Sequence, residues 1–465
     1  MINTINWKII NTTNWNTINT TNWNEDQQEA LRVITDFRMS SDKRVMTLCG
    51  PAGAGKTTLL RSLQMPMAAP THKAKNLLAK GSMQSAFTVA ELLGHAPDTD
   101  IANFDPDKPE FVQKYKPKIQ TVSSIAIDEC SMINDKLTQV LIDKAAEYGT
   151  KIIFSGDKFQ IPPVNQSSLS ATFNYTTAEL KKIIRQSNTN PLMLYLLALR
   201  ADIGYKLLGF EEPKVIEDLS SFYLDYIGSK NLQDFLHNHK GSKFQQLLRF
   251  HHIHNDNGGI YILNRDEAIK FHDARMKTPQ FRSLAFTNES VRKANKIVYP
   301  TDRFQVNDVI MGYRTLTVGE FANSREYVIH DISTGEIENI ECEILRISED
   351  SKKTFDIFCP TSSGYSDFVK QDYLEKDAAI RSRNWKKYFS WRDVYCIPRF
   401  LNTEKYDVDF GSAMTVHKSQ GSTIPNVFIN HPDIAKIARY QDYTTYLRMM
   451  YVALSRATSN AYILL

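Results

Sequence analysis

The stretch with the most demanding spacing is Gly50-Pro51-Ala52-Gly53-Ala54-Gly55-Lys56-Thr57-Thr58, which has the pattern G-x-x-x-x-G-K-T. Its glycines permit backbone angles that other residues avoid, so successive amides can turn inward around a phosphate. Lys56 can reach the β- and γ-phosphates of a nucleotide, and the Thr57 hydroxyl can ligate Mg²⁺. These residues suit the binding of a nucleoside triphosphate together with its metal.

Two adjacent acids, Asp128 and Glu129, follow the apolar run 124–127. Beside a phosphate loop they suit two roles: Asp128 holds Mg²⁺ through water, and Glu129 orients or deprotonates the attacking water. Gln160, in the polar turn after the apolar run 151–156, is placed to sense a γ-phosphate. The plainer alternatives are surface acids at the end of a strand and a solvated loop glutamine.

The elements that must position these groups are strands followed by polar turns. The runs 45–49, 124–127 and 151–156 are apolar, and each ends at one of the polar motifs. In open α/β sheets ligands bind outside the carboxyl ends of the strands, so we expect the motifs to converge on one crevice. A second α/β unit begins with the strand and helix at 282–297, and the pattern returns from 411 to 465.

Length and composition set limits on the class of protein. A chain of 465 residues suggests two to four domains, and 42% hydrophobic with 23% charged residues is ordinary for a globular protein. The net charge of +4 is compatible with nucleic-acid binding but is not evidence for it. The five cysteines have no metal-ligand spacing, and neither a membrane span nor a secretory signal is present in the sequence, so we expect reduced thiols and a cytoplasmic protein, in the host cytoplasm if the source is viral.

Three segments differ from this α/β pattern. Residues 1–23 repeat Trp7, Trp15 and Trp23 in an Asn- and Thr-rich context, which predicts a disordered tail. The proline-rich and charged stretch within 95–120 predicts an inserted loop or hairpin. Residues 301–405 form short β-like runs and predict a β-rich insertion, whose aromatic and basic end at 381–399 suits either a nucleic-acid strand or packing onto a neighbouring domain.

In order along the chain, the motifs resemble those of the superfamily 1B DNA helicases, the 5′-to-3′ branch, and among them the phage Dda-type helicases. The resemblance covers nearly the whole chain from residue 24 onward. One position departs from it, because Ala90 and Glu91 follow Thr88-Val89 where the family usually has a histidine. The motifs that carry the resemblance are N-x-x-Q-x-x-A at Asn24, G-P-A-G-x-G-K-T-T at Gly50, A-P-T-H at Ala69, D-E at Asp128, G-D-x-x-Q-x-x-P-V at Gly156, A-F-T-N at Ala285, T-x-H-K-x-Q-G at Thr415 and Y-V-A-L-S-R-A at Tyr451.

The resemblance implies an α/β fold of two RecA-like P-loop NTPase domains that clasp ATP and Mg²⁺ between them. The first would cover 24–190 with a hairpin insertion at about 95–120, and the second 191–300 and 406–465 with an SH3-like insertion at 301–405. Gln27 would read the adenine, and Arg185 and Arg456 would supply positive charge to the γ-phosphate. The strand of DNA would be lined by Pro70, Thr71, His72, Thr287, Asn288, His417 and Lys418, with Phe111 on the strand-splitting hairpin.

The implied function is an ATP-dependent 5′-to-3′ DNA helicase that acts as a monomer on single-stranded and forked DNA, with single-strand-binding or replication proteins as candidate partners. Three alternatives stay open at this point. The motifs do not separate DNA from RNA, and a nucleotide-switched binding protein would carry the same ATP site without moving. A small-molecule P-loop kinase is the third, although it would leave Gln160, Arg185 and Arg456 without a role.

Overall fold

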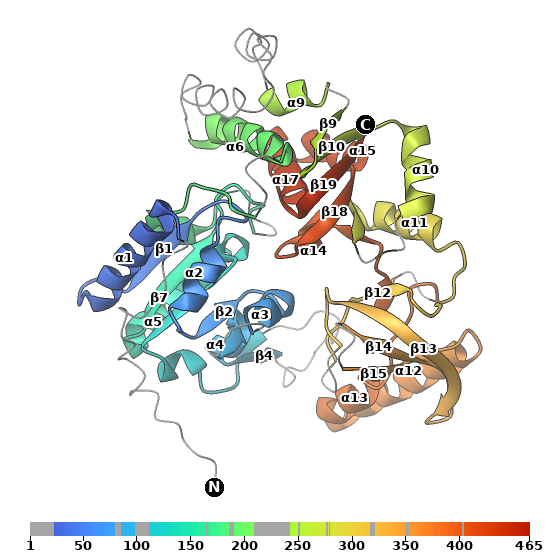
Figure 1. Ribbon diagram of the computed structural model, residues 1–465. Helices are drawn as coiled ribbons and strands as arrows, with labels where there is room; N and C mark the ends of the chain where they lie inside the picture. Colours follow the sequence, from blue (N-terminus) through green and yellow to red (C-terminus); the bar gives the residue numbers. More distant parts are fainter. Residues whose placement is uncertain are drawn as a thin grey trace.

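The computed structural model shows three bodies: two α/β domains side by side and a β-rich body that adjoins both (Figure 1). Residues 1–22 of the predicted tail and 98–110 of the predicted hairpin lie outside the described residues. Trp23 is described, and it packs against the core of the first domain beside α1, so the predicted tail extends one residue too far. The structure describes residues 23–79, 85–97, 111–163, 166, 168–185, 190–208, 242–249, 252–275, 278, 280–316, 321–349, 353–401 and 404–465.

The first domain is built on a six-stranded parallel sheet with the order β3-β2-β6-β7-β1-β8. Its central strands are almost entirely buried because helices cover both faces, and this is why they read as continuous apolar runs. Their carboxyl ends lie together, with Cys49 of β1 paired with Gly156 of β7. The elements are α1 (Glu25–Met39), β1 (Val45–Cys49), α2 (Lys56–Ser62), β2 (Met67–Ala69), α3 (His72–Ala79), β3 (Ala86–Thr88), α4 (Val89–Leu93), η3 (Lys118–Thr121), β6 (Ser124–Ile127), η4 (Cys130–Met132), α5 (Asp135–Tyr148), β7 (Lys151–Gly156), η5 (Ala171–Tyr175) and β8 (Thr176–Glu179).

The second domain repeats this architecture with the strand order β17-β11-β18-β19-β10-β9. All neighbouring strands are parallel except β9, which pairs antiparallel with β10 at the edge. The two sheets are those of two RecA-like domains. The elements are α6 (Leu192–Leu208), α9 (Lys243–Leu247), β9 (His252–Asn255), β10 (Gly258–Leu263), α10 (Arg265–Arg275), β11 (Phe281–Ala285), α11 (Asn288–Val298), β17 (Ala413–Thr415), α14 (Val416–Ser419), β18 (Ile424–Asn430), α15 (His431–Ala435), α16 (Ile437–Tyr440), α17 (Tyr443–Ser455) and β19 (Ala457–Leu464).

The β-rich body, which we call the insertion, interrupts the second domain between α11 and β17. It is a five-stranded antiparallel sheet with the order β15-β14-β13-β12-β16. Because β16 pairs with β12, the insertion runs to Phe410 and passes the predicted boundary at 405. Its elements are β12 (Val309–Gly312), β13 (Glu326–Ile337), β14 (Ile340–Ser348), β15 (Phe355–Pro360), α12 (Gly364–Ser382), α13 (Trp385–Arg392) and β16 (Val408–Phe410).

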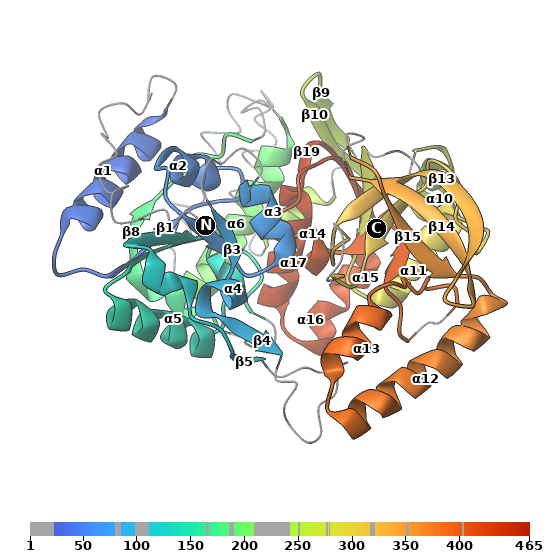
Figure 2. The same ribbon diagram turned by 90° about the horizontal axis from the view of Figure 1, so that it is seen from below.

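The aromatic residues of α13 form a core within the insertion. Trp385, Tyr388 and Trp391 are buried, and Trp391 stacks on Phe368 of α12 at a ring distance of 5.6 Å. Helix α12 lies along the outer edge of the molecule (Figure 2). The structure thus places these aromatics in the core of the insertion, whereas the sequence analysis expected a nucleic-acid strand or packing onto a neighbouring domain.

All five cysteines are free and buried, and they are spread over the first domain and the insertion. Burial raises the pKa of each thiol, so each is held in its protonated form. None of the described helices is both long and apolar enough to cross a bilayer. The cysteines are Cys49, Cys130, Cys342, Cys359 and Cys396.

Candidate nucleotide cleft and nucleic-acid interface

The phosphate loop between β1 and α2 depends on two glycines with left-handed backbones. Gly53 has φ +82° and Gly55 has φ +87°, conformations that side chains with a Cβ rarely adopt. Space is also lacking: a Cβ on Gly53 would lie 2.5 Å from Cβ of Arg185, and one on Gly55 would lie 2.6 Å from Nε2 of Gln27. The loop is therefore shaped as much by the side chains packed on it as by its own sequence.

Lys56, the first residue of α2, points back into the loop. Its ammonium group donates to the carbonyl oxygens of Gly50 at 2.8 Å and Pro51 at 3.0 Å. This places the cation where the loop amides and the positive end of α2 also favour an anion. The arrangement fits the phosphates of a nucleotide.

Thr57 and Asp128 come together at the carboxyl ends of β1 and β6, as predicted. The Thr57 hydroxyl donates to Oδ2 of Asp128 at 2.6 Å, while Ser155 of β7 donates to Oδ1 at 2.8 Å. Among the described residues no three His, Cys, Asp or Glu side chains gather as a metal cage.

Glu129 follows Asp128 with a left-handed backbone, φ 54°. Burial raises the pKa of the Glu129 carboxyl, and the charge of Asp128 adds to the rise. The positive charges of Arg456, Lys56 and Arg185 oppose it. A carboxylate in this environment is suited to accept a proton from a water beside the phosphate.

Arg185 and Arg456 approach the cleft from opposite domains. Nη1 of Arg185 donates to the carbonyl oxygen of Ser455 at 3.1 Å, and Nη2 of Arg456 donates to the Ser455 hydroxyl at 2.8 Å. Burial lowers the pKa of Arg456 to about 10, and the charge of Arg185 contributes. Two guanidinium groups near one another, that of Arg456 buried and that of Arg185 half-buried, favour an anion between the domains.

Gln27 and Gln160 lie at the two sides of the nucleotide cleft. Gln27 forms a capping box with Asn24 at the start of α1, and its Nε2 lies 3.5 Å from the carbonyl oxygen of Ala54. Gln160 is buried, and its Oε1 accepts no hydrogen bond from the described residues. A buried acceptor without a donor costs free energy, so a water or a substrate group is needed there.

Three predicted nucleic-acid motifs share one local structure, a strand that ends in a threonine capping a helix. The hydroxyls of Thr71, Thr287 and Thr415 accept the amides of Ala74 at 3.2 Å, Ser290 at 3.2 Å and Lys418 at 3.3 Å. The helices α3, α11 and α14 thus begin at the carboxyl edges of the two sheets, with their amide-rich ends at the predicted strand path. Of the other predicted contacts, His72 and Asn288 are exposed, and Pro70 and His417 are half-buried.

Lys418, one of the residues predicted to line the DNA strand, is packed against other side chains. Its ammonium group lies 3.1 Å from the ring centre of Tyr313, in the segment that follows β12. Burial lowers the pKa of Lys418 to about 7, while the nearby Asp409 opposes the change. Its backbone oxygen accepts from Lys73 of α3 at 3.2 Å, so this residue joins the first domain, the second domain and the insertion.

The position where the sequence departs from the family has a structural role in the first domain. Glu91 accepts the backbone amide of Thr88 at 2.8 Å, which completes a capping box for α4. It also pairs with Lys75 of α3 at 2.7 Å. The acid therefore ties α4 to the helix of the A-P-T-H motif.

Phe111 lies on a two-stranded ladder of β4 (His95–Pro97) and β5 (Phe111–Gln113). It pairs with Pro97, and 55% of its surface is exposed. The turn that joins the strands falls outside the described residues. Phe111 thus stands on a strand of the hairpin and projects an aromatic ring to solvent.

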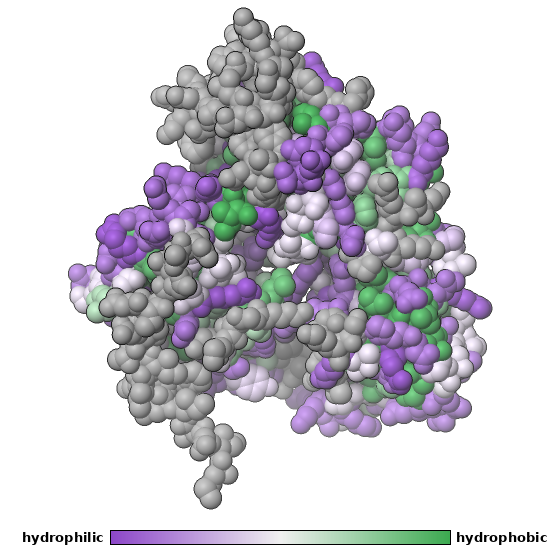
Figure 3. Space-filling view, in the orientation of Figure 1, coloured by the Kyte–Doolittle hydropathy of each residue, from purple (hydrophilic) through white to green (hydrophobic). Residues whose placement is uncertain are grey.

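The three bodies enclose a cavity of about 300 Å³ beside these motifs. It is lined by Lys73 of α3, Arg282 of β11 and Glu326 of β13, together with residues 422–424 that follow α14. The front face is mostly hydrophilic and is hollowed between the first domain and the insertion (Figure 3). A cavity lined by residues of all three bodies therefore lies beside α3, one of the helices that carry the predicted contacts.

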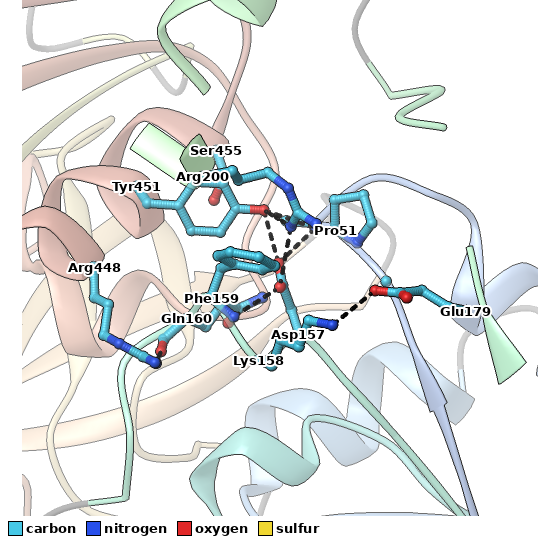
Figure 4. Close-up of polar contacts among 12 residues, drawn as sticks. Pro51, Asp157, Lys158, Phe159, Gln160, Glu179, Arg200, Arg448, Tyr451 and Ser455 are labelled. Carbon is cyan, nitrogen blue, oxygen red and sulfur yellow. Dashed lines mark hydrogen bonds and ion pairs between the residues drawn. The ribbon is translucent and has the colours of Figure 1, made fainter. Parts of the chain in front are cut away.

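Three further side chains at the cleft were not predicted as functional. Asp157 of the first domain contacts Tyr451 and Arg200 of the second (Figure 4). Asp157 belongs to the motif G-D-x-x-Q and Tyr451 to the motif Y-V-A-L-S-R-A, so their positions in these motifs could have marked them as functional. Arg200 lies in an apolar helix, and no motif marks it.

Comparisons with known proteins agree with this architecture. The AAA domain family matches residues 22–203, and the UvrD-like helicase C-terminal domain family matches residues 410–464. The ATP-dependent DNA helicase dda of Enterobacteria phage T4 is 25% identical over 490 residues, which cover 93% of this chain and 97% of that protein. The ATP-dependent DNA helicase Pif1 of Campylobacter jejuni is 25% identical over 207 residues, 40% of this chain and 46% of that protein.

Among solved structures, the chain is similar in fold to a Pif1 helicase from a study of DNA unwinding at forked double-stranded DNA. The TM-score is 0.51 with 16% identity, over 94% of this chain and 91% of that one. The two sheets are thus those expected from the sequence motifs. Together these matches support a superfamily 1B helicase similar to dda, and the chain is an ATP-hydrolysing enzyme.

Proposed function

We propose that the protein moves 5′ to 3′ along single-stranded DNA at the expense of ATP and separates duplex DNA at a fork. The observation that supports this most is the cleft between two RecA-like domains. One wall carries Lys56 and Glu129, and the other carries Arg456. Because hydrolysis there uses groups from both domains, each ATP cycle changes what holds the domains together.

The nucleotide would lie with its phosphates in the loop and its adenine beside Gln27. Lys56 would neutralise the β- and γ-phosphates, and Thr57 and Asp128 would hold Mg²⁺, directly and through water. Bound Mg²⁺ would offset the negative charge on the phosphate oxygens. Glu129 would take the proton of the attacking water while Arg185 and Arg456 stabilise the charge on the γ-phosphate.

The strand of DNA would cross the carboxyl edges of both sheets. The first turns of α3 and α11, which begin after Thr71 and Thr287, present backbone amides suited to phosphate oxygens. The two domains would approach and separate during each ATP cycle. If the domains bind the DNA strand tightly in alternation, the strand moves in one direction. DNA is proposed as the substrate because the relatives dda and Pif1 are named as DNA helicases. The direction is proposed from the resemblance of the motifs to those of the 5′-to-3′ branch.

A measurement of ATP turnover tests this function against its alternatives. We expect single-stranded DNA to stimulate turnover strongly and single-stranded RNA to do so much less. Stronger stimulation by RNA would make the protein an RNA-directed translocase. Binding of DNA without stimulation would indicate a nucleotide-dependent switch, and indifference to both nucleic acids would favour a small-molecule kinase.

A second measurement tests direction. Duplexes with a 5′ or a 3′ single-stranded tail are incubated with ATP, and the released strand is separated by electrophoresis. We expect release from the 5′-tailed substrate and little from the 3′-tailed one. The opposite preference would contradict the proposed polarity.

A further inference from the structure

The loop that follows β7 is attached to the second domain, although it belongs to the first. Phe159 and Ile161 of this loop are buried in the same hydrophobic cluster as α6 and α17 of the second domain. The backbone oxygen of Gln160 accepts a hydrogen bond from Arg448 of α17. This loop therefore crosses the nucleotide cleft and is fixed on its far side (Figure 4).

Asp157 is the polar centre of this attachment. Its carboxylate is fully buried and lies between two partners in the second domain. The Tyr451 hydroxyl donates to Oδ2 at 2.7 Å, and Nη1 of Arg200 lies 3.3 Å from Oδ1. The same Nη1 is 3.2 Å from the Tyr451 hydroxyl, so the three groups form a closed triangle.

Packing holds the triangle in place. The guanidinium carbon of Arg200 lies 3.9 Å from the ring centre of Phe159, and the Phe159 ring meets Tyr451 edge-on with centres 6.5 Å apart. A cation over an aromatic face and away from water is a favourable arrangement. Burial raises the pKa of Tyr451, with Asp157 adding to the rise, so its hydroxyl stays a donor at neutral pH.

The triangle also holds the phosphate loop. The Ala52 amide donates to Oδ2 of Asp157 at 3.0 Å and lies 3.4 Å from the Tyr451 oxygen. One carboxylate oxygen thus serves the nucleotide-binding loop of the first domain and a tyrosine of the second. Gln160 follows in the same loop, and Arg456 ends the helix that carries Tyr451.

We propose that Asp157, Arg200 and Tyr451 are positioning residues that couple the phosphate loop to the second domain, and so set Gln160 and Arg456 against the γ-phosphate during hydrolysis. This inference rests on the proposed function. The three side chains act through Ala52, Gln160 and Arg456 and do not themselves touch the nucleotide. Removing the coupling should slow the hydrolytic step more than it weakens ATP binding.

The test is the Tyr451→Phe variant, which keeps the ring and removes only the hydroxyl. A hydrogen bond to a buried charged group is strong enough that we expect kcat for ATP hydrolysis to fall about tenfold or more. KM for ATP should stay within about twofold, because the Tyr451 hydroxyl does not itself touch the nucleotide. Both constants are measured with and without single-stranded DNA.

The matched control is Tyr195→Phe. Tyr195 is also buried in the second-domain cluster, and its hydroxyl donates to the backbone oxygen of Leu247 at 3.0 Å within that domain. The Tyr195→Phe substitution removes one buried hydrogen bond that lies within the second domain and does not cross the cleft, so kcat should be unchanged. Equal losses of kcat in the two variants, or normal kcat in Tyr451→Phe, would overturn the proposal.

A second pair of variants tests the charge. Arg200→Lys keeps a cation in reach of Asp157, whereas Arg200→Met keeps only the apolar stem, so the lysine variant should retain the higher kcat. Equal kcat in the two would contradict a role for the ion pair. If DNA fails to stimulate the wild type, the proposed function fails, and kcat without nucleic acid still decides whether the positioning residues act on hydrolysis.

Discussion

At the scale of single residues, the cleft is notable for charged groups that are held in largely desolvated surroundings. Glu129 has a raised pKa and Arg456 a lowered one, each chiefly because of burial. Groups in such surroundings are stabilised when a charged substrate arrives, so they favour the bound state and the transition state over the empty cleft.

Glu129→Gln should preserve ATP binding and slow hydrolysis by a factor on the order of 100 or more, because it keeps the shape and removes the proton acceptor. Single-turnover hydrolysis and equilibrium binding of ATP measure the two effects. Turnover close to that of the wild type would move the role of base to another residue.

The raised pKa of Glu129 also predicts the pH dependence of the wild type. A carboxyl with a raised pKa loses its charge at a higher pH than an exposed glutamate does, so the base becomes protonated earlier as the pH falls. The acid limb of the kcat profile should therefore lie above pH 4.5, the ordinary value for glutamate. A limb at or below that value would show that the bound nucleotide, with its metal, restores an ordinary pKa.

Lys56→Ala should abolish ATP hydrolysis and leave the affinity for single-stranded DNA in the absence of nucleotide within about tenfold of the wild type. The ammonium group contacts the carbonyls of Gly50 and Pro51 in the loop, away from α3, α11 and α14. Filter binding of a labelled oligonucleotide measures the affinity. A collapse of DNA binding would place the lysine in both sites.

At the scale of elements, short caps place functional side chains. Helix α1 begins with a capping box in which the Asn24 side chain accepts the Gln27 amide at 2.9 Å, and the Gln27 side chain accepts the Asn24 amide at 3.2 Å. The bond that starts the helix therefore also orients the glutamine that packs on Gly55. If Gln27 binds the adenine as proposed, the start of α1 and nucleotide recognition depend on the same two residues.

Asn24→Ala should lower the free energy of unfolding by about 1 kcal/mol, the usual cost of a lost cap, and also raise KM for ATP. Asn134→Ala is the matched control, since Asn134 caps α5 by accepting the Leu137 amide at 2.9 Å and has no contact with the phosphate loop. The control should lose similar stability at unchanged KM. Urea denaturation and steady-state kinetics distinguish the outcomes, and equal KM values in the two variants would contradict the role of the cap.

The elements also show what the sequence can and cannot predict. The phosphate loop, the strand before it and the Asp128-Glu129 turn were predicted correctly because their signals are local: apolar runs that end in polar motifs. The end of the insertion was wrong because β16 is defined by its pairing with β12, far away in the chain. The attachment of Asp157 to Tyr451 and Arg200 could not be predicted, because it depends on how two domains face one another.

At the scale of the whole molecule, the proposed function assigns ATP hydrolysis and strand separation to different parts. The cleft lies between the two sheets, whereas Phe111 lies on the β4–β5 ladder that projects from the first domain. A motor with a separate wedge can lose duplex opening while it keeps hydrolysis.

Phe111→Ala should keep DNA-stimulated ATP turnover near the wild-type rate and reduce the unwinding of a 5′-tailed duplex, because it removes a stacking contact of roughly 1–3 kcal/mol with the last base pair. Tyr440→Ala is the control: Tyr440 lies on α16 of the second domain and is 79% exposed. Strand release and turnover are measured on the same substrate. Parallel losses of both activities in Phe111→Ala would assign the ring to folding instead.

The burial of every cysteine has a practical consequence for experiments that follow the opening and closing of the cleft. Thiol-reactive dyes attack thiolates, and buried thiols with raised pKa values are poor targets. The native cysteines should therefore react little with such dyes, and cysteines introduced elsewhere can be labelled selectively. Cysteines introduced in place of Met39 and Tyr440, which are 80% and 79% exposed on different domains, would carry a donor and an acceptor fluorophore. Energy transfer between them would follow the opening and closing of the cleft in single molecules, cycle by cycle.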